Sequence, residues 1–156
     1  MGFLASLSVE EIMTLKIIKG NLLDATEDLI IHGCNCFCNM NAGVAKALKE
    51  MWPDVYQADL NTKKGATNKL GSYSFSPVSL NQAVINAYTQ YRYGRGKVHL
   101  DYSALKKVLD TINKEWPTSS IALPKIGCGL AGGDWKKVQP IIEKSLHSNE
   151  VTVYCL

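Results

Sequence analysis

The sequence has no long hydrophobic run, which argues against a membrane-spanning helix. Its apolar stretches are short, such as residues 121–123, whereas a helical span needs about 20 consecutive apolar residues. Residues 1–11 have neither a basic start nor a long apolar segment, so we expect no secretory signal. We expect a cytoplasmic protein, and interpret residues 1–12 as an upstream extension or a cloning remnant that precedes a domain spanning residues 13–156.

The sequence also lacks a strong charge asymmetry. Its 17 lysines and arginines outnumber its 14 aspartates and glutamates by only three, and they are scattered along the chain without forming a basic tail or stripe. This pattern predicts no specific nucleic-acid binding. It remains compatible with an anionic small molecule, because backbone N–H groups can hold a diphosphate with little help from net charge.

The cysteines do not form an even-numbered disulfide framework. The chain has five of them, and without an export signal we expect reduced thiols. The Cys-x-Cys-x-Cys run at residues 34–38 suggests zinc as an alternative, but zinc pairs are usually separated by two to four residues and need further ligands. We therefore favour small buried or loop cysteines and predict no metal and no cofactor.

The length and the 46% hydrophobic content fit one α/β domain, and no internal repeat or low-complexity linker divides it. Apolar periodicity predicts three helices: residues 42–51, a second from near Tyr102 to before Pro117, and a third from Asp134. Short apolar or alternating runs predict strands at residues 15–18, 29–32, 72–78, 82–88, 120–123 and 151–154. This order predicts a central mixed sheet with helices on both faces.

Two glycine-containing loops stand between a predicted strand and a predicted helix. Residues 33–43 read GCNCFCNMNAG and residues 127–133 read GCGLAGG. In α/β sheets, ligands bind outside the carboxyl ends of strands, where helix N-termini favour anions. The two loops therefore predict a phosphate-binding edge.

The second loop also matches the G-x-G-x-x-G pattern of dinucleotide-binding Rossmann folds. That fingerprint belongs to a first strand-helix-strand unit and is followed by an acidic residue about 20 residues later. Only one predicted strand, Val-Thr-Val-Tyr, follows this loop. A Rossmann coenzyme site is therefore disfavoured, although close backbone approach to phosphate still explains the glycines.

Four motifs in order resemble the macro domain. They are KGNLL at residues 19–23, IHGCNC at 31–36, AGVA at 42–45 and PKIGCGLAGG at 124–133. The resemblance extends from Leu15 to the C-terminus, and the branch it most resembles is that of the ADP-ribose-1''-phosphate phosphatases with their phage and bacterial relatives. It implies a three-layer α/β/α fold with a mixed sheet and a site for ADP-ribose.

The resemblance also implies roles for individual residues. Asn21 takes the adenine-side position, where the family usually has an aspartate, and its carbonyl can accept the same hydrogen bond without charge assistance. Asn35 takes the position that bonds a hydroxyl of the distal ribose, and Tyr154 takes that of an aromatic residue near the adenine or the proximal ribose. The implied ligand-binding set is Asn21, Leu22, Gly33, Cys34, Asn35, Met40, Asn41, Ala42, Gly43, Val44, Ala45, Ile126, Gly127, Cys128, Gly129, Leu130, Ala131, Gly132 and Tyr154.

The candidate catalytic residues are His32 and Asn35. His32 matches a histidine proposed as catalytic in the phosphatase branch; the alternative is a strand-end histidine bonded to backbone. Asp134 could act as a base, but an aspartate before Trp-Lys-Lys-Val is also a good N-cap. A related branch that removes ADP-ribose from glutamate uses a lysine and an aspartate, where this sequence has Gln90 and Ala131.

These expectations leave three functions open. The leading hypothesis is hydrolysis of ADP-ribose 1''-phosphate to ADP-ribose and phosphate, with the loops holding the diphosphate and His32 assisting proton transfer. The second is a module that binds ADP-ribose without turnover. The third is hydrolysis of ADP-ribosyl esters on macromolecules. Tyr88, Tyr91, Arg92 and Tyr93 either border this site or pack as core and ordered surface loop.

Overall fold

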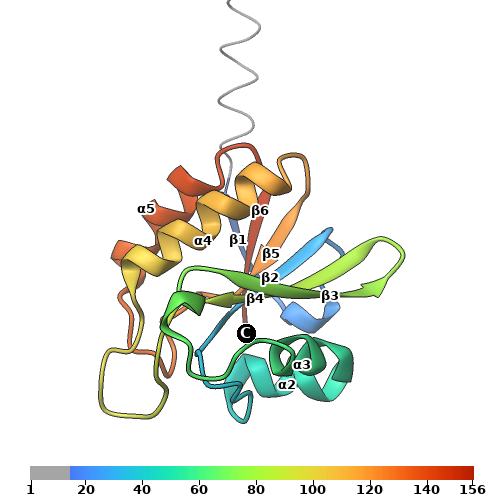
Figure 1. Cartoon of the computed structure of the whole chain (residues 1–156). Helices are drawn as coiled ribbons and strands as arrows, with labels where there is room; N and C mark the ends of the chain where they lie inside the picture. The colour runs from blue at the N-terminus through green and yellow to red at the C-terminus, as the bar shows by residue number, and fades with distance from the viewer. Residues whose placement is uncertain (1–14) are drawn as a thin grey trace, which may run out of the picture.

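The protein is described by a computed structural model that defines residues 15–156 (Figure 1). The boundary expected between residues 12 and 13 lies outside these residues and stays a prediction. Within the described residues, no helix has the length and apolar character needed to cross a bilayer.

Six strands form one mixed sheet in the order β1-β6-β5-β2-β4-β3. Neighbouring strands are parallel except for β3, which is antiparallel to β4. Each strand lies within two residues of the position predicted from hydrophobic periodicity, and the expected α/β class is confirmed. The strands are β1 (Leu15–Lys19), β2 (Leu29–Cys34), β3 (Tyr73–Ser79), β4 (Gln82–Tyr88), β5 (Ile121–Leu123) and β6 (Val151–Cys155).

Helices cover both faces of this sheet, as Figure 1 shows. On one side lie α2 (Gly43–Met51) and α3 (Pro53–Leu60), and on the other α4 (Tyr102–Glu115) and α5 (Trp135–Ser145). The helix α3 was not predicted, because the sequence pattern at Pro53 indicated only that the preceding helix stops or restarts there. Proline fits the first turn of a helix, where its missing N–H is not needed, and here it begins α3. Two 3-10 turns complete the chain, η1 (Leu22–Asp24) and η2 (Thr67–Lys69).

The central strands β2 and β4 are buried on both faces. Ile30 and Val84 point into the apolar cluster under α2 and α3, whereas Ile31 and Ile85 point into the larger cluster under α4 and α5. Such near-continuous apolar runs are typical of parallel strands covered on both sides. The packing fixes the carboxyl ends of these strands, from which the first ligand loop and its neighbours begin.

Candidate functional site

A cleft of about 660 Å³ opens at the carboxyl edge of the sheet. The first loop leads from β2 to α2 and the second from β5 to α5, and residues of both line the cleft. Because β2 and β5 are parallel neighbours, their ends project to the same edge. The sheet therefore brings together two loops that are far apart in the sequence.

Backbone N–H groups of both loops are available at this edge. In the first turn of α2, the N–H groups of Gly43, Val44 and Ala45 have no acceptor among residues 15–156. The same is true of three consecutive N–H groups in the second loop, those of Gly129, Leu130 and Ala131. Unpaired donors at a helix start and in a curved loop attract anions.

Two positions in the second loop, Gly132 and Gly133, have too little space for a side chain. A Cβ on Gly133 would lie 2.6 Å from the Gly127 carbonyl oxygen, and one on Gly132, whose φ is +74°, would lie 3.1 Å from the Lys97 carbonyl oxygen. The tight turn is closed by a hydrogen bond from Gly133 N to Gly127 O at 2.7 Å. The glycines thus let the backbone fold tightly on itself and present its free N–H groups.

The cleft brings together most of the residues that the sequence suggested. Those that line it are His32, Gly33, Cys34, Asn35, Ala42, Gly43, Val44, Ala45, Ile126, Gly127, Cys128, Gly129, Leu130, Ala131 and Tyr154. Five suggested residues do not line it, namely Asn21, Leu22, Met40, Asn41 and Gly132.

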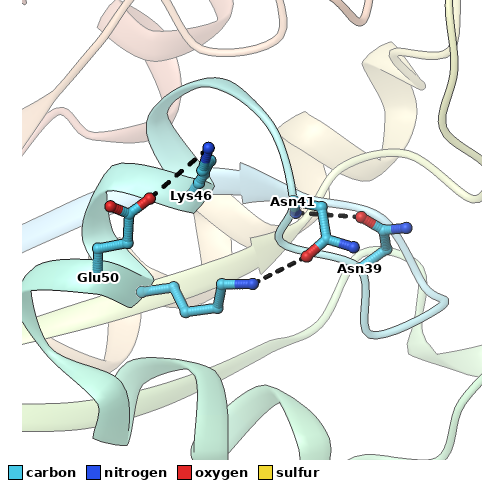
Figure 2. Close-up of polar contacts among 5 residues, drawn as sticks. Asn39, Asn41, Lys46 and Glu50 are labelled. Atoms are coloured by element: carbon cyan, nitrogen blue, oxygen red, sulfur yellow. Dashed lines mark hydrogen bonds and ion pairs between the residues drawn. The ribbon is translucent and has the colours of Figure 1, made fainter.

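Tertiary packing explains why four of these five lie elsewhere. Leu22 and Met40 are buried in the apolar cluster under α2 and α3. Asn41 is held from the helix side, since Lys49 Nζ donates to its Oδ1 at 2.8 Å, while its own N donates to Asn39 Oδ1 at 3.1 Å (Figure 2). The Oδ1 atom of Asn21 caps η1 by accepting from Leu23 N at 2.9 Å. The two bonds accepted by Asn21 and Asn39 are local, whereas the burial of Leu22 and Met40 depends on the fold.

His32 borders the cleft but is almost completely buried, with 1% of its surface exposed. Its Nε2 lies 2.6 Å from Asn86 Oδ1 on the neighbouring strand β4, and an amide oxygen can only accept. Burial lowers the pKa of His32 to about 4, so the imidazole is neutral at pH 7 and donates through Nε2. This geometry favours a structural role for His32, whose hydrogen bond is made to the Asn86 side chain and not, as the alternative interpretation had it, to backbone. The catalytic role of His32 stays a prediction that burial does not favour.

The side chain of Asn35 is engaged within the first loop. Its Nδ2 donates to the Asn39 carbonyl oxygen at 2.8 Å, and its Oδ1 accepts from Phe37 N at 2.9 Å. Both bonds close the turn that follows β2. In this structure Asn35 shapes the loop, and a direct contact with a ribose hydroxyl stays a prediction.

We expect Asn35→Ala to weaken the binding of ADP and ADP-ribose about equally. The substitution removes two bonds that hold the first loop, at a cost of about 1–3 kcal/mol, and the diphosphate expected at the N–H groups beyond that loop is common to both ligands. Calorimetric titration with each ligand measures the effect. A loss confined to ADP-ribose would instead assign Asn35 to the distal ribose.

A buried polar cluster supports the first loop from below. Lys69 is 6% exposed, and its Nζ donates to the Cys36 carbonyl oxygen at 3.3 Å and lies 3.5 Å from Cys38 Sγ. The same ammonium stands 4.7 Å from the centre of the Tyr88 ring, whose hydroxyl donates to Asp59 Oδ1 at 2.7 Å. Burial raises the pKa of Asp59, and the nearby Lys69 opposes that shift. Lys69 therefore compensates a buried carboxylate and fixes loop backbone.

Lys69→Met should lower the free energy of unfolding by about 1–3 kcal/mol, because it removes the hydrogen bond to the Cys36 carbonyl oxygen and the nearby cation that partly offsets the buried Asp59. Urea unfolding monitored by circular dichroism measures this loss. The matched control Lys144→Met removes an exposed ammonium and should change stability by less than about 0.5 kcal/mol. Equal effects in the two variants would contradict a compensating role for Lys69.

Six cleft residues were not among those suggested from the sequence. Three lie within or beside the recognised motifs and three come from the β4–α4 loop and the end of β6; they are Asn39, Gly94, Arg95, Pro124, Lys125 and Cys155. Gln90 and Tyr93, which the sequence had linked to this site, also line the cleft. Among the residues that line the cleft, Arg95 and Lys125 are cationic and none is an aspartate or glutamate. The cleft therefore presents N–H donors and positive charge, which suits a phosphate-bearing ligand.

The other candidate side chains have local roles. Asp134 is the N-cap of α5 and accepts from Lys136 N at 3.0 Å, in agreement with the capping alternative. Gln90 and Ala131 both line the cleft. At the positions matched to the lysine and the aspartate of the branch that removes ADP-ribose from glutamate, this chain thus has an amide and a methyl group. The three clustered cysteines, Cys34, Cys36 and Cys38, are all buried.

The fold and the cleft together define a class of small α/β domains that hold a phosphate-bearing ligand between two glycine loops at a sheet edge. Residues 31–142 match the family model of the macro domain. The chain belongs to the macro-domain family, whose members bind ADP-ribose. The resemblance noted from the four sequence motifs is thereby confirmed.

Relatives agree with this assignment. A protein of phage T4, described as an uncharacterized 17.5 kDa protein in the tk-vs intergenic region, is 33% identical over 90% of this chain and 96% of its own length. A DNA ADP-ribosyl glycohydrolase of Thermus aquaticus is 29% identical over 87% of this chain, which spans 39% of that protein. The macrodomain of Thermus aquaticus DarG superposes with a TM-score of 0.73 at 24% identity, covering 92% of this chain and 99% of that one.

Proposed function

We propose that this domain binds ADP-ribose in the cleft and hydrolyses the bond that joins its anomeric carbon to a larger molecule. The observation that carries the proposal is that two groups of three backbone N–H donors, at residues 43–45 and 129–131, face one cleft without an acceptor among the described residues. A diphosphate has enough oxygen acceptors to bond to both sets. The Thermus aquaticus relative, a DNA ADP-ribosyl glycohydrolase, supports the hydrolytic part.

The two ends of the cleft then indicate where the adenosine and the distal ribose lie. With the diphosphate between Gly43 and Gly129, the adenosine lies toward Tyr154, whose ring would lie 3.5 Å from a Cβ atom added to Gly20. The distal ribose lies toward Gly33 and Asn39, whose Nδ2 has no acceptor among the described residues. In this arrangement the anomeric carbon faces the cleft mouth, where an attached molecule leaves the site.

Catalysis in this scheme rests on positioning and electrostatics. Among residues 15–156, no aspartate or glutamate lines the cleft, and His32 is neutral and bonded to Asn86. The N–H groups hold the ligand so that water can add to the anomeric carbon as the bond to the attached group breaks. The water's proton passes through a diphosphate oxygen, the nearest anion of the bound substrate, to the leaving group.

Hydrolysis of ADP-ribose 1''-phosphate is the second candidate. The phosphatase-like motifs support it, as do Arg95 and Lys125 on the cleft wall, because a terminal phosphate adds charge that these cations can neutralise. It does not need His32 as a proton donor if the cations stabilise the leaving phosphate.

One experiment separates these candidates. The protein is incubated with a glutamate-linked ADP-ribosyl peptide, an ADP-ribosylated oligonucleotide and ADP-ribose 1''-phosphate, and ADP-ribose and phosphate are measured. Release of ADP-ribose from either conjugate supports our proposal. Phosphate release alone favours the phosphatase, and calorimetric binding of ADP-ribose without any product identifies a binding module.

A further inference from the structure

One long stretch of the chain carries charge of a single sign. Between Leu60 and Leu100 there is no aspartate or glutamate. The stretch contains six cations, of which Lys69 is buried. The other five are exposed: Lys63, Lys64, Arg92, Arg95 and Lys97.

Folding brings the two groups of exposed cations together. Gly65, next to Lys64, donates its N–H to the Cys36 carbonyl oxygen at 2.7 Å. Its own carbonyl oxygen accepts from the Tyr91 hydroxyl at 2.7 Å. The segment with Lys63 and Lys64 is thereby held against the start of the loop that carries the two arginines.

Aromatic rings lie among these cations. The Phe37 ring centre is 4.9 Å from that of Tyr91 and 6.5 Å from that of Tyr93. The Arg92 guanidinium lies 5.7 Å from the Phe37 ring centre and 5.4 Å from that of Tyr91. Tyr93 is 52% exposed and presents its ring to solvent. We call Lys63, Lys64, Arg92, Arg95 and Lys97, with Phe37, Tyr91 and Tyr93, the basic band.

The basic band adjoins the mouth of the cleft. Tyr93, Gly94 and Arg95 line the cleft from the loop that joins β4 to α4, which projects at the lower left of Figure 1. The far end of this loop is fixed to the second ligand loop, since His99 N donates to the Ala131 carbonyl oxygen at 2.8 Å. A molecule attached at the cleft mouth therefore meets the band.

We propose that the basic band binds single-stranded nucleic acid, so that the ADP-ribosyl group in the cleft is one attached to a nucleic-acid strand. This rests on the proposed function, whose substrate class it names. Exposed cations neutralise backbone phosphates, and exposed rings and guanidinium planes stack on bases without regard to sequence. Gly96, beside Arg95 and Lys97, is open to solvent, since a Cβ built on it meets no atom within 4 Å.

The rings distinguish this partner from an acidic peptide. Carboxylates would need only the cations, whereas unstacked bases need flat apolar surfaces beside them. The sequence alone had predicted no specific nucleic-acid binding, because the band's cations are separated along the chain. The proposed binding is independent of base sequence and arises from the fold.

Fluorescence anisotropy with an unmodified 12-nucleotide single strand tests the proposal. The triple variant Lys63→Glu, Lys64→Glu and Arg92→Glu should weaken binding at least tenfold at 0.1 M salt and flatten its salt dependence. The matched control Lys106→Glu, Lys114→Glu and Lys144→Glu reverses three exposed lysines on α4 and α5 and should weaken it less than threefold. Saturating ADP-ribose should leave strand binding largely intact, because only Tyr93 and Arg95 of the band also line the cleft.

ADP-ribose calorimetry with the triple variant shows whether the cleft is intact, and its affinity should match that of the wild type. No strand binding by the wild type would overturn the proposal. So would equal losses in the two triple variants, or binding of polyglutamate as tight as that of the strand. If strand binding holds but ADP-ribose does not bind, the proposed function fails while the band remains a nucleic-acid site.

Discussion

Gly43→Glu should weaken ADP-ribose binding by more than about tenfold. Gly43 is the first residue of α2, has a φ of +58°, and a Cβ built on it meets no atom within 4 Å. A glutamate there projects into the cleft, adds negative charge beside the diphosphate, and strains a left-handed backbone position by about 1 kcal/mol. The loss should be the same for ADP, because both ligands carry the diphosphate.

Calorimetry with three ligands measures this effect. Adenosine, which lacks phosphate, should bind Gly43→Glu as it binds the wild type. Gly43→Asn is the matched control, because asparagine tolerates positive φ and carries no charge, and it should retain most of the affinity. Unchanged ADP-ribose affinity in a folded Gly43→Glu protein would show that the diphosphate is not held at the start of α2.

Stability should fall by about 3 kcal/mol between pH 6.5 and pH 4 because of His32 alone. The pKa of His32 in the folded protein is lowered from 6.5 to about 4. Above pH 6.5 the imidazole is therefore neutral in both the folded and the unfolded state, and it does not lower the stability. As the pH falls below 6.5, His32 becomes protonated in the unfolded chain but stays neutral in the folded protein. The free energy of unfolding therefore declines until about pH 4. Asp59, whose pKa burial raises, acts in the opposite direction.

His32→Gln isolates the histidine contribution, because glutamine can still donate to Asn86 but does not titrate. Urea unfolding at pH 7, 6, 5 and 4 should show a smaller decline for the variant than for the wild type. Parallel declines would mean that His32 titrates normally and is not sealed between β2 and β4. At pH 7 the variant should also keep any hydrolytic activity, whereas its loss in a folded, ligand-binding protein would restore the catalytic role.

The elements that sequence reasoning located share a local cause. β4 carries a run of buried apolar residues and pairs with β3 across a short turn, so periodicity and turn residues suffice to find both. Asp134 precedes an amphipathic run, and capping is decided within three residues. The helix α3 was not located because its apolar face is weak and begins at a proline.

The ligand loops were predictable for a related reason. A strand, a glycine-rich segment and a helix in succession place free N–H groups at one sheet edge, whichever residues fill the loop. The second loop needs glycines because segments of its own backbone lie too close together for side chains, as Gly133 and Gly127 do. The cleft residues from the β4–α4 loop, such as Arg95, carried no such pattern and were missed.

By itself, the sequence determined the order of the six strands and of three of the helices, the mixed sheet, the two glycine loops and the Asp134 cap, since each depends on neighbouring residues and their periodicity. Only tertiary structure decided what polar side chains with distant partners do. It buried His32 against Asn86, and it joined Lys63 and Lys64 to the arginines beside Tyr91. Hydrogen-bond partners and local charge density are set by long-range contacts, and a residue's type and spacing do not encode which distant group it will meet.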